Sequence, residues 1–172
     1  MLILSAYHRV LTYWKKIIYE LLFIEQWQLR YKFDQNTETG FDGQLNTYQQ
    51  IIPPKDRFWA DPFIVEENGV HYVFVEELEF EEGKGYISVI ELKEGVSKPL
   101  KSQKILEKPY HLSYPFIFKL QDTYYMIPES TANKTIDLYQ CEDFPLKWRY
   151  CNALMENVIA ADTTIKFHDG KY

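Results

Sequence analysis

The sequence predicts a mostly β fold built from a repeated unit of about fifty residues, and three observations support this. Laying Asp61-Pro62-Phe63-Ile64 over Tyr114-Pro115-Phe116-Ile117, a shift of 114 − 61 = 53 residues, also superposes Glu76 on Glu129 without a gap. A third copy begins at Asp162-Thr163-Thr164-Ile165, shifted by 162 − 114 = 48 residues. The turn formers Asn68-Gly69, Gln121-Asp122 and Asp169-Gly170 then share one column. Short strands repeated at this period are typical of β-propeller blades, which are four-stranded meanders around a central channel.

Each complete unit is expected to contain four strands. In the first unit, apolar alternation and turn residues predict strands over residues 61–65, 70–75, 86–92 and 101–106. In the second unit the expected strands are residues 114–118, 123–127, 135–141 and 147–154. The sequence thus predicts blades near residues 50–106 and 107–154, and a truncated third blade over 155–172. Two blades and part of a third leave the ring unclosed, with sheet edges open to aggregation, so we interpret the chain as a partial propeller and a fragment of a complete one.

Residues 1–24 are predicted to form an amphipathic α-helix. Apolar side chains recur in steps of three and four, at Leu4, Tyr7, Leu11, Trp14, Ile18 and Leu21. Charges at Arg9, Lys15 and Lys16 argue against a transmembrane span, and no small-residue cleavage site follows as a signal peptide requires. We expect the apolar face to be hidden from water. Its partner could be another domain or the side of the propeller, a dimer seam, or a membrane surface.

Residues 25–49 are predicted to be a strand followed by a polar connector. Trp27, Leu29, Tyr31 and Phe33 alternate with polar residues, which is the pattern of a half-buried strand. The chain then turns polar up to Tyr48, and Pro53-Pro54 blocks any helix before the first repeat.

Composition narrows the classes of partner. The 172 residues are 46% hydrophobic and 17% aromatic, which is typical of a globular protein. A net charge of −6 would repel phosphate backbones and argues against nucleic acid as a partner. Cys141 and Cys151 could face each other across a hairpin, but two isolated cysteines are more typical of reduced thiols. No His lies near them at metal-ligand spacing, so we expect no metal site and no cofactor. Reduced thiols favour a cytoplasmic location, and the chain could be peripheral to the membrane there.

Asp61, Tyr114 and Asp162 occupy the same position of the repeat, so a propeller would place all three near one mouth of its channel. Two carboxyl groups there could cleave a glycosidic bond. In that reaction one carboxylate activates water or attacks the sugar, and one carboxylic acid protonates the leaving oxygen. The alternative is that each Asp caps a turn through its side chain.

Glu76 and Glu129 also coincide, each at the end of a second strand, which favours a repeated structural role. Glu129 is nevertheless a candidate for substrate contact. His111 precedes the second innermost strand and could line the pocket as a hydrogen-bonding group, or be an ordinary surface or core histidine. Gly83-Lys84-Gly85 is predicted to be a hairpin turn, because it lacks the context of a phosphate loop.

Four motifs resemble a known family, and the resemblance covers about residues 50–172. The motifs are Trp59-Ala60-Asp61-Pro62-Phe63, His111-Leu112-Ser113-Tyr114-Pro115-Phe116, Tyr125-Met126-Ile127-Pro128-Glu129-Ser130 and Asp162-Thr163-Thr164. They resemble the glycoside-hydrolase-like propeller domain of plant glucosamine inositolphosphorylceramide transferases and its bacterial relatives. More distantly, the chain is similar to the five-bladed arabinanase and β-xylosidase enzymes. That resemblance implies that Asp61 is a general base and that Asp162 tunes the pKa of the acid. The family's acid, a Glu in a later blade, has no counterpart in these residues.

The sequence therefore predicts part of a five-bladed propeller that binds or processes a glycan and is linked to a glycosyl- or sugar-modifying transferase. The expected catalytic residues are Asp61 and Asp162. The expected substrate contacts are Trp59, His111, Tyr114 and Glu129. The expected partner is a carbohydrate or glycolipid, and this chain alone is expected to be inactive because the acid Glu is missing. The alternative is a non-catalytic interaction propeller.

Overall fold

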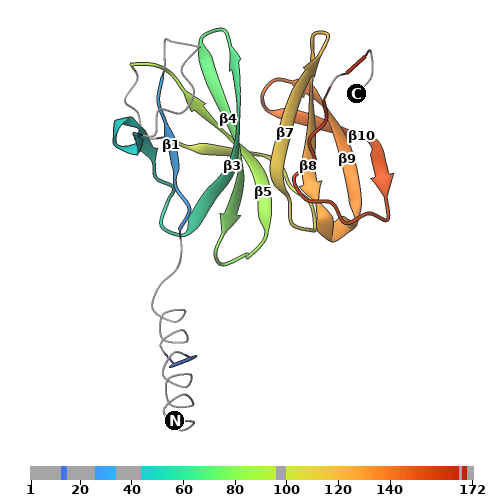
Figure 1. Cartoon of the computed structure of the whole chain (residues 1–172), viewed down its shortest axis with the longest axis horizontal. Helices are drawn as coiled ribbons and strands as arrows, with labels where there is room; N and C mark the ends of the chain where they lie inside the picture. Colours follow the sequence, from blue (N-terminus) through green and yellow to red (C-terminus); the bar gives the residue numbers. More distant parts are fainter. Residues whose placement is uncertain (1–12, 15–25, 34–43, 96–99, 167, 170–172) are drawn as a thin grey trace.

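The computed structural model describes residues 13–14, 26–33, 44–95, 100–166 and 168–169. Among these the chain is mostly β and forms three antiparallel sheets (Figure 1). The small sheet pairs β1 (Leu29–Tyr31) with β2 (Gln49–Ile51). The first four-stranded sheet has the order β3 (Arg57–Glu67), β4 (Val70–Glu79), β5 (Gly85–Leu92) and β6 (Ser102–Leu106). The second consists of β7 (Ser113–Leu120), β8 (Thr123–Ser130), β9 (Thr135–Asp143) and β10 (Lys147–Glu156).

Both four-stranded sheets are meanders, so the strands predicted for the two complete units are confirmed, most of them one to four residues longer than expected. Two-residue turns join β3 to β4 and β7 to β8, with positive φ at Asn68 (53°), Gly69 (73°) and Gln121 (55°), as tight hairpins require. In the third unit only an isolated bridge at His168 is assigned, and the described residues after β10 contain no further strand. Two single-turn 3₁₀ helices, Leu45–Thr47 and Thr131–Asn133, complete the described elements.

The helix expected over residues 1–24 lies almost wholly outside the described residues. Only Tyr13 and Trp14 are described; both are helical, with 65% and 56% of their surface exposed. The expected burial of the apolar stripe is therefore wrong at Trp14. The strand expected from Trp27 is shorter than predicted, because only Leu29–Tyr31 pair and Trp27 stays 65% exposed. Among the described residues, no helix has the length and apolar character needed to cross a bilayer.

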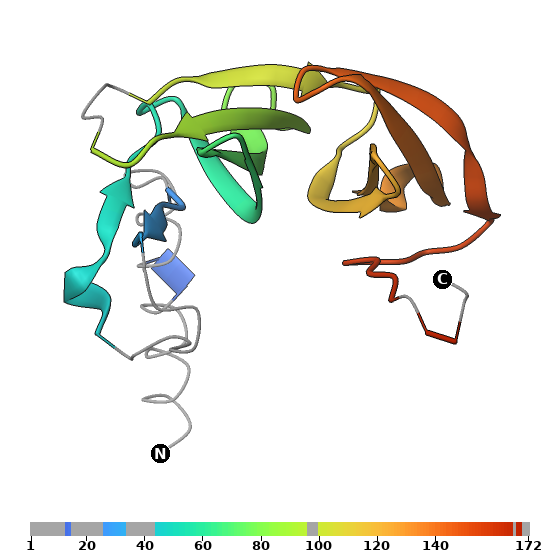
Figure 2. The ribbon, with the colours of Figure 1, turned by 90° about the horizontal axis from the view of Figure 1, so that it is seen from above.

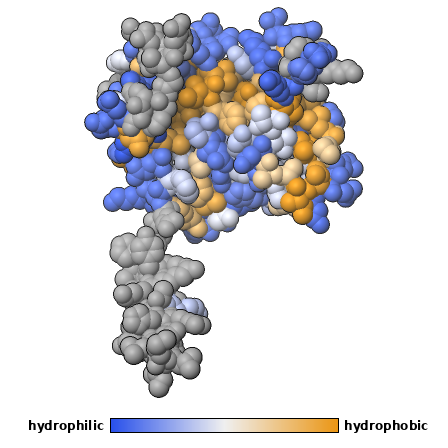
Figure 3. Space-filling model, viewed as in Figure 1, coloured by the Kyte–Doolittle hydropathy of each residue, from blue (hydrophilic) through white to orange (hydrophobic). Residues whose placement is uncertain are grey.

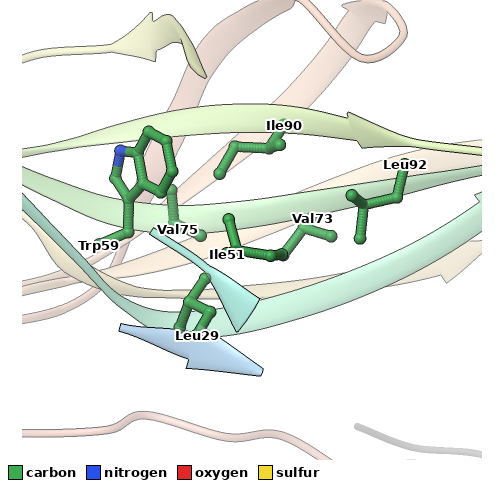
Figure 4. Close-up of a cluster of buried hydrophobic side chains, with 7 residues drawn as sticks. All are labelled: Leu29, Ile51, Trp59, Val73, Val75, Ile90 and Leu92. Carbon is green, nitrogen blue, oxygen red and sulfur yellow. The ribbon is translucent and has the colours of Figure 1, made fainter. Parts of the chain in front are cut away.

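The small sheet covers one face of the first four-stranded sheet. Leu29 of β1 and Ile51 of β2 pack on a cluster formed by Trp59, Val73, Val75, Ile90 and Leu92 (Figure 4). These side chains alternate along their strands, as a sheet face requires. The pairing of β1 with β2 therefore closes the first core.

The opposite face of the first sheet packs against the second sheet, and Figure 2 shows the two sheets side by side. The first sheet contributes Phe74, Ile87, Val89 and Leu106, and the second side contributes Leu112, Met126 and Tyr139. Strands β3 and β7, the first of each sheet, are in direct contact. The junction between β3 and β7 therefore brings together the residues that the repeat aligns.

Candidate functional site

The three aligned positions share an unusual backbone. Asp61, Tyr114 and Asp162 all have positive φ, at 49°, 42° and 51°. This conformation is uncommon for residues other than Gly, so its recurrence marks one repeated local structure. The sequence pattern predicted that Asp61 begins a strand. It lies instead at a bulge inside β3, where pairing skips from Ala60 to Phe63.

The same irregularity occurs in β7, where pairing skips from Ser113 to Phe116 and leaves Tyr114 outside the ladder. A bulge re-aims the side chain of the unpaired residue. At the bulge in β3 the carboxyl of Asp61 points to the neighbouring sheet. Its Oδ2 accepts a hydrogen bond from the backbone N–H of Tyr114 at 3.3 Å. Burial, and next the negative charge of Glu76, raise the pKa of Asp61 above its usual value.

Glu76 and His111 form a pair beside Asp61. The carboxylate of Glu76, a residue only 7% exposed, lies 3.1 Å from His111 Nε2. The backbone N–H of Gly85 donates to His111 Nδ1 at 2.9 Å. In the neutral ring the proton therefore sits on Nε2, where it is donated to Glu76. The hydrogen bond to Glu76 raises the pKa of His111, although a second proton on Nδ1 would displace the Gly85 bond.

Gly85 is required by close approach rather than by a turn. A Cβ atom there would lie 2.6 Å from the Leu112 carbonyl oxygen, 2.8 Å from His111 Cε1 and 3.0 Å from Glu76 Oε1. The backbone N–H of Leu112 also donates to the Gly85 carbonyl at 3.0 Å. Gly85 is the first residue of β5, and its backbone N–H holds His111 in place through the hydrogen bond to Nδ1. The predicted turn applies to Gly83, which has φ of +61° and open space around it.

Glu129 joins the third copy to the second sheet. Its Oε2 accepts a hydrogen bond from the backbone N–H of Asp162 at 2.9 Å, and its Oε1 accepts one from the Thr131 hydroxyl at 3.2 Å. The Tyr114 hydroxyl lies 3.0 Å from the Thr164 hydroxyl, which adds a second tie to the same segment. Asp162 itself is exposed.

Trp59 is placed elsewhere. Its side chain is 1% exposed within the core between β1–β2 and the first sheet, so it offers no ring face to a sugar, and its indole N–H has no partner among the described residues. The ring of Tyr114 stands edge-on to Phe63 at 5.0 Å between centroids.

The structure thus brings Asp61, His111, Tyr114, Glu129 and Asp162 to one junction and leaves Trp59 out. The structure adds Glu76 to these residues. In the sequence, only the alignment of Glu76 with Glu129 pointed to it.

This junction groups three carboxylates, those of Asp61, Glu76 and Glu129, which are hydrogen-bond acceptors of the kind that hold sugar hydroxyls. A carboxylate whose pKa is raised, as that of Asp61 is, accepts a proton more readily than an ordinary Asp. In the described part of the chain, no three His, Cys, Asp or Glu side chains are grouped closely enough to hold a metal ion.

Comparison with known proteins matches residues 48–172 to a family described as "Glucosamine inositolphosphorylceramide transferase 1, N-terminal". The chain is 32% identical over 114 residues to glucosamine inositolphosphorylceramide transferase 1 of rice (Oryza sativa subsp. indica), covering 66% of this chain and 15% of the rice protein. It is also 32% identical over 117 residues to the protein of the same name in Arabidopsis thaliana, covering 67% of this chain and 15% of that protein. The chain thus spans about 15% of the length of these relatives. No solved structure matches.

Proposed function

Because this chain belongs to the family of the N-terminal region of glucosamine inositolphosphorylceramide transferase 1, we propose that it is a glycan-recognition module of a glycolipid-related transferase. The observation that carries the proposal is the convergence of Asp61, Glu76, His111 and Glu129 at the junction of β3 and β7. Carboxylates and imidazole are the groups that bind sugar hydroxyls, and each of these is held by a partner in the fold.

The finer part of the proposal is a β-propeller. Two four-stranded meanders pack face to face with their first strands in contact, and the aligned positions share one backbone conformation. These features support reading the sheets as neighbouring blades, of five if the resemblance to arabinanases holds, with the junction at the mouth of the channel.

In the proposed site Asp61 is the base. Burial and Glu76 raise its pKa, so it would accept a proton from a sugar hydroxyl or a water more readily than an exposed Asp. Asp162, at the aligned position of the third copy, would adjust the charge of the site. Its charge already contributes to the raised pKa of Asp61.

A glycolipid substrate implies work at a membrane surface. We propose a cytoplasmic, membrane-peripheral location in which the apolar stripe of residues 2–24 touches lipid. Sedimentation of the chain with anionic liposomes, with a version lacking residues 1–24 as the control, tests this. Equal sedimentation of both versions would contradict it.

One observation favours a second function, a non-catalytic interaction module. The carboxylates of Asp61 and Glu129 each accept a hydrogen bond from a backbone N–H of the next unit, which is what a structural tie between sheets would do. In that case a protein partner would bind on the rims of the blades, and its affinity would not depend on the charge of Asp61.

Asp61→Asn separates the two functions, because it removes charge and basicity while keeping an oxygen that can accept the Tyr114 N–H. We expect binding to vesicles containing inositolphosphorylceramide, measured with the complete polypeptide, to fall about tenfold or more. Turnover should be abolished, while a lost turn cap alone would cost about 1 kcal/mol or less. Asp122→Asn, in the exposed turn after β7, is the matched control. Unchanged binding and turnover in Asp61→Asn, with unchanged melting, would establish the interaction module instead.

A further inference from the structure

The carboxyl groups of Asp61 and Glu76 are in direct contact. In the ladder Glu76 pairs with Ala60, the last paired residue before the bulge that carries Asp61. The side chain of Asp61 is hydrogen-bonded to that of Glu76. An ionised carboxylate only accepts hydrogen bonds, so two carboxyl groups can bond to each other only when one of them carries a proton. The contact therefore belongs to a form in which the two groups hold one proton between them.

Each of the two groups is also fixed by a donor of its own. Oδ2 of Asp61 accepts the backbone N–H of Tyr114 at 3.3 Å, and the carboxylate oxygen Oε1 of Glu76 lies 3.1 Å from His111 Nε2. Because the backbone N–H of Gly85 donates to His111 Nδ1, the neutral ring carries its proton on Nε2 and gives it to Glu76. The fold thus sets the position of both carboxyl groups before any ligand binds.

The surroundings favour the form with one proton. Glu76 is only 7% exposed and Asp61 is partly buried, so water screens the repulsion between two charged carboxylates poorly. The other charged and titratable groups that face the pair are Glu129 of β8, Asp162 of the third copy and His111 of the segment before β7. In the space-filling view, hydrophobic areas remain visible over both sheets and hydrophilic residues lie between them (Figure 3).

We propose that Asp61 and Glu76 act as one acid–base pair that holds a shared proton on one side of the ligand. The proposal rests on the proposed function, in which Asp61 is the base. Asp61 contacts the ligand, and Glu76 is a positioning residue that acts through Asp61. When Asp61 accepts the proton of a sugar hydroxyl or a water, Glu76 keeps the shared proton, and the pair passes from a single negative charge to none. The oxygen that loses the proton keeps the electron pair of the broken O–H bond.

The spacing of the pair decides which reaction it can serve. Glycoside cleavage needs two carboxyl groups on opposite sides of the bond, about 5–5.5 Å apart for retention or about 6.5–9.5 Å for inversion. Two groups joined by a hydrogen bond, with oxygens about 2.5–3.0 Å apart, leave no room for a glycosidic bond between them. Glu76 is therefore not the missing acid of a glycosidase. The pair suits proton transfer to or from one hydroxyl, as in carboxyl pairs that share one proton.

The test follows the ¹³C signal of the Asp61 carboxyl during an NMR pH titration of the chain. In the unmodified chain Asp61 should titrate above its usual pKa, and the carboxyl signal of Glu76 should respond over the same pH range, because one proton serves both groups. In Glu76→Gln the amide keeps an oxygen for His111 and supplies an N–H in place of the shared proton. We expect unchanged melting and a downward shift of the Asp61 midpoint.

Glu129→Gln is the matched control at the aligned position. Glu129 accepts from the Asp162 N–H and the Thr131 hydroxyl, so it shares no proton with Asp61, and its replacement should leave the Asp61 midpoint in place. An equal shift in both variants would overturn the proposal, because it would show a general effect of charge. An unshifted midpoint in a well-folded Glu76→Gln would overturn it as well.

The unmodified chain decides the question even if Glu76→Gln does not fold. A midpoint of Asp61 at or below its usual value, or a Glu76 signal that does not respond when Asp61 titrates, would overturn the proposal. The titration involves no glycan, so such a result would leave the binding of glycolipid vesicles untouched. Conversely, a chain in which the two carboxyl groups titrate together but vesicles are not bound would refute the proposed function while the shared proton stands.

Discussion

The first and second four-stranded sheets have the same layout but different surroundings. Both are four-stranded meanders with a bulge near the start of the first strand. The first sheet lies between β1–β2 and the second sheet, so both of its faces are covered. Among the described residues, the second sheet has a covering sheet on one face only. The comparison teaches that local sequence sets the strands, whereas neighbouring sheets set how much each strand stabilises the fold.

The two sheets also differ in their buried polar groups. Arg57 at the start of β3 lies 2.8 Å from Glu77 and 3.3 Å from Glu79. The residue that corresponds to Arg57 in the next unit is Tyr110, which donates to the buried carboxylate of Asp137 at 3.3 Å. The charged donor of the first unit is thus replaced by a neutral donor in the second, and its carboxylate partner lies on a different strand, β9 in place of β4.

The largest expected effect comes from Arg57→Met. The side chain of Glu77 is only 2% exposed, and without Arg57 its charge would keep just the Ser102 hydroxyl among the partners seen in the described residues. Breaking such a pair from one side typically costs about 3–5 kcal/mol. The free energy of unfolding from urea titration measures this.

Arg149→Met in the second sheet is the control, because the Arg149–Glu142 pair is about half exposed on both sides. It should cost no more than about 1 kcal/mol. Equal losses in the two variants would show that the Arg57 network is not protected from solvent as the structure describes it.

Next in size is the difference between Ile87→Ala and Ile136→Ala. The two positions correspond, because Ile87 pairs with Glu76 across β4 and β5, and Ile136 pairs with Glu129 across β8 and β9. Ile87 is fully buried between the sheets, so its loss should cost about 2–5 kcal/mol. Ile136 is only partly buried in this chain, so we expect about 1 kcal/mol there. Comparing the two unfolding midpoints checks this. A loss of stability at Ile136 as large as at Ile87 would mean that the face of the second sheet that carries Ile136 is covered in the isolated chain.

Most of the strand layout could be predicted from the sequence, since alternation and turn residues are local signals. The strand β2 was missed because only three residues pair, and Gln49 and Gln50 carry no apolar pattern. The exposure of Trp27 could not be foreseen, because periodicity shows which face a residue occupies but not whether another element covers it.

The candidate site was predicted less completely. Alignment of the repeats found Asp61, Tyr114 and Asp162, since equivalent positions of equivalent units must lie on one side. It could not show the bulges or the positive φ, because Asp and Tyr give no glycine-like signal. The close approach at Gly85 and the pairing of Glu76 could not be seen in the sequence, because both depend on contact with His111, a residue far along the chain.

A smaller effect is expected at Gly85, where the two sheets meet at His111. In Gly85→Ala the new Cβ must push the Leu112 carbonyl and the His111 ring, at a cost of about 1–3 kcal/mol. Gly83→Ala is the control, with open space and only the penalty for positive φ, about 1–2 kcal/mol. The imidazole NMR signals of His111 distinguish the variants, since only Gly85→Ala should shift them. Unshifted signals in Gly85→Ala would contradict the close approach.

The smallest expected effect is a pH dependence that separates Glu76 from its counterpart Glu129. Glu76 accepts from His111, whereas Glu129 accepts from the Asp162 N–H, so only Glu76 is coupled to a titrating partner by a hydrogen bond. Because Glu76 raises the pKa of His111 above 6.5, the resulting stability is fully present below pH 6.5 and is lost as the pH rises through the raised value. The His111 side chain is 40% exposed, so solvent screening should keep the change below about 1 kcal/mol. NMR titration of His111 should show the raised pKa, and Glu76→Gln should lower it while Glu129→Gln changes it little. A His111 pKa below 6.5 in the unmodified chain would instead mean that the N–H of Gly85, by occupying Nδ1, outweighs the carboxylate on the other side of the ring.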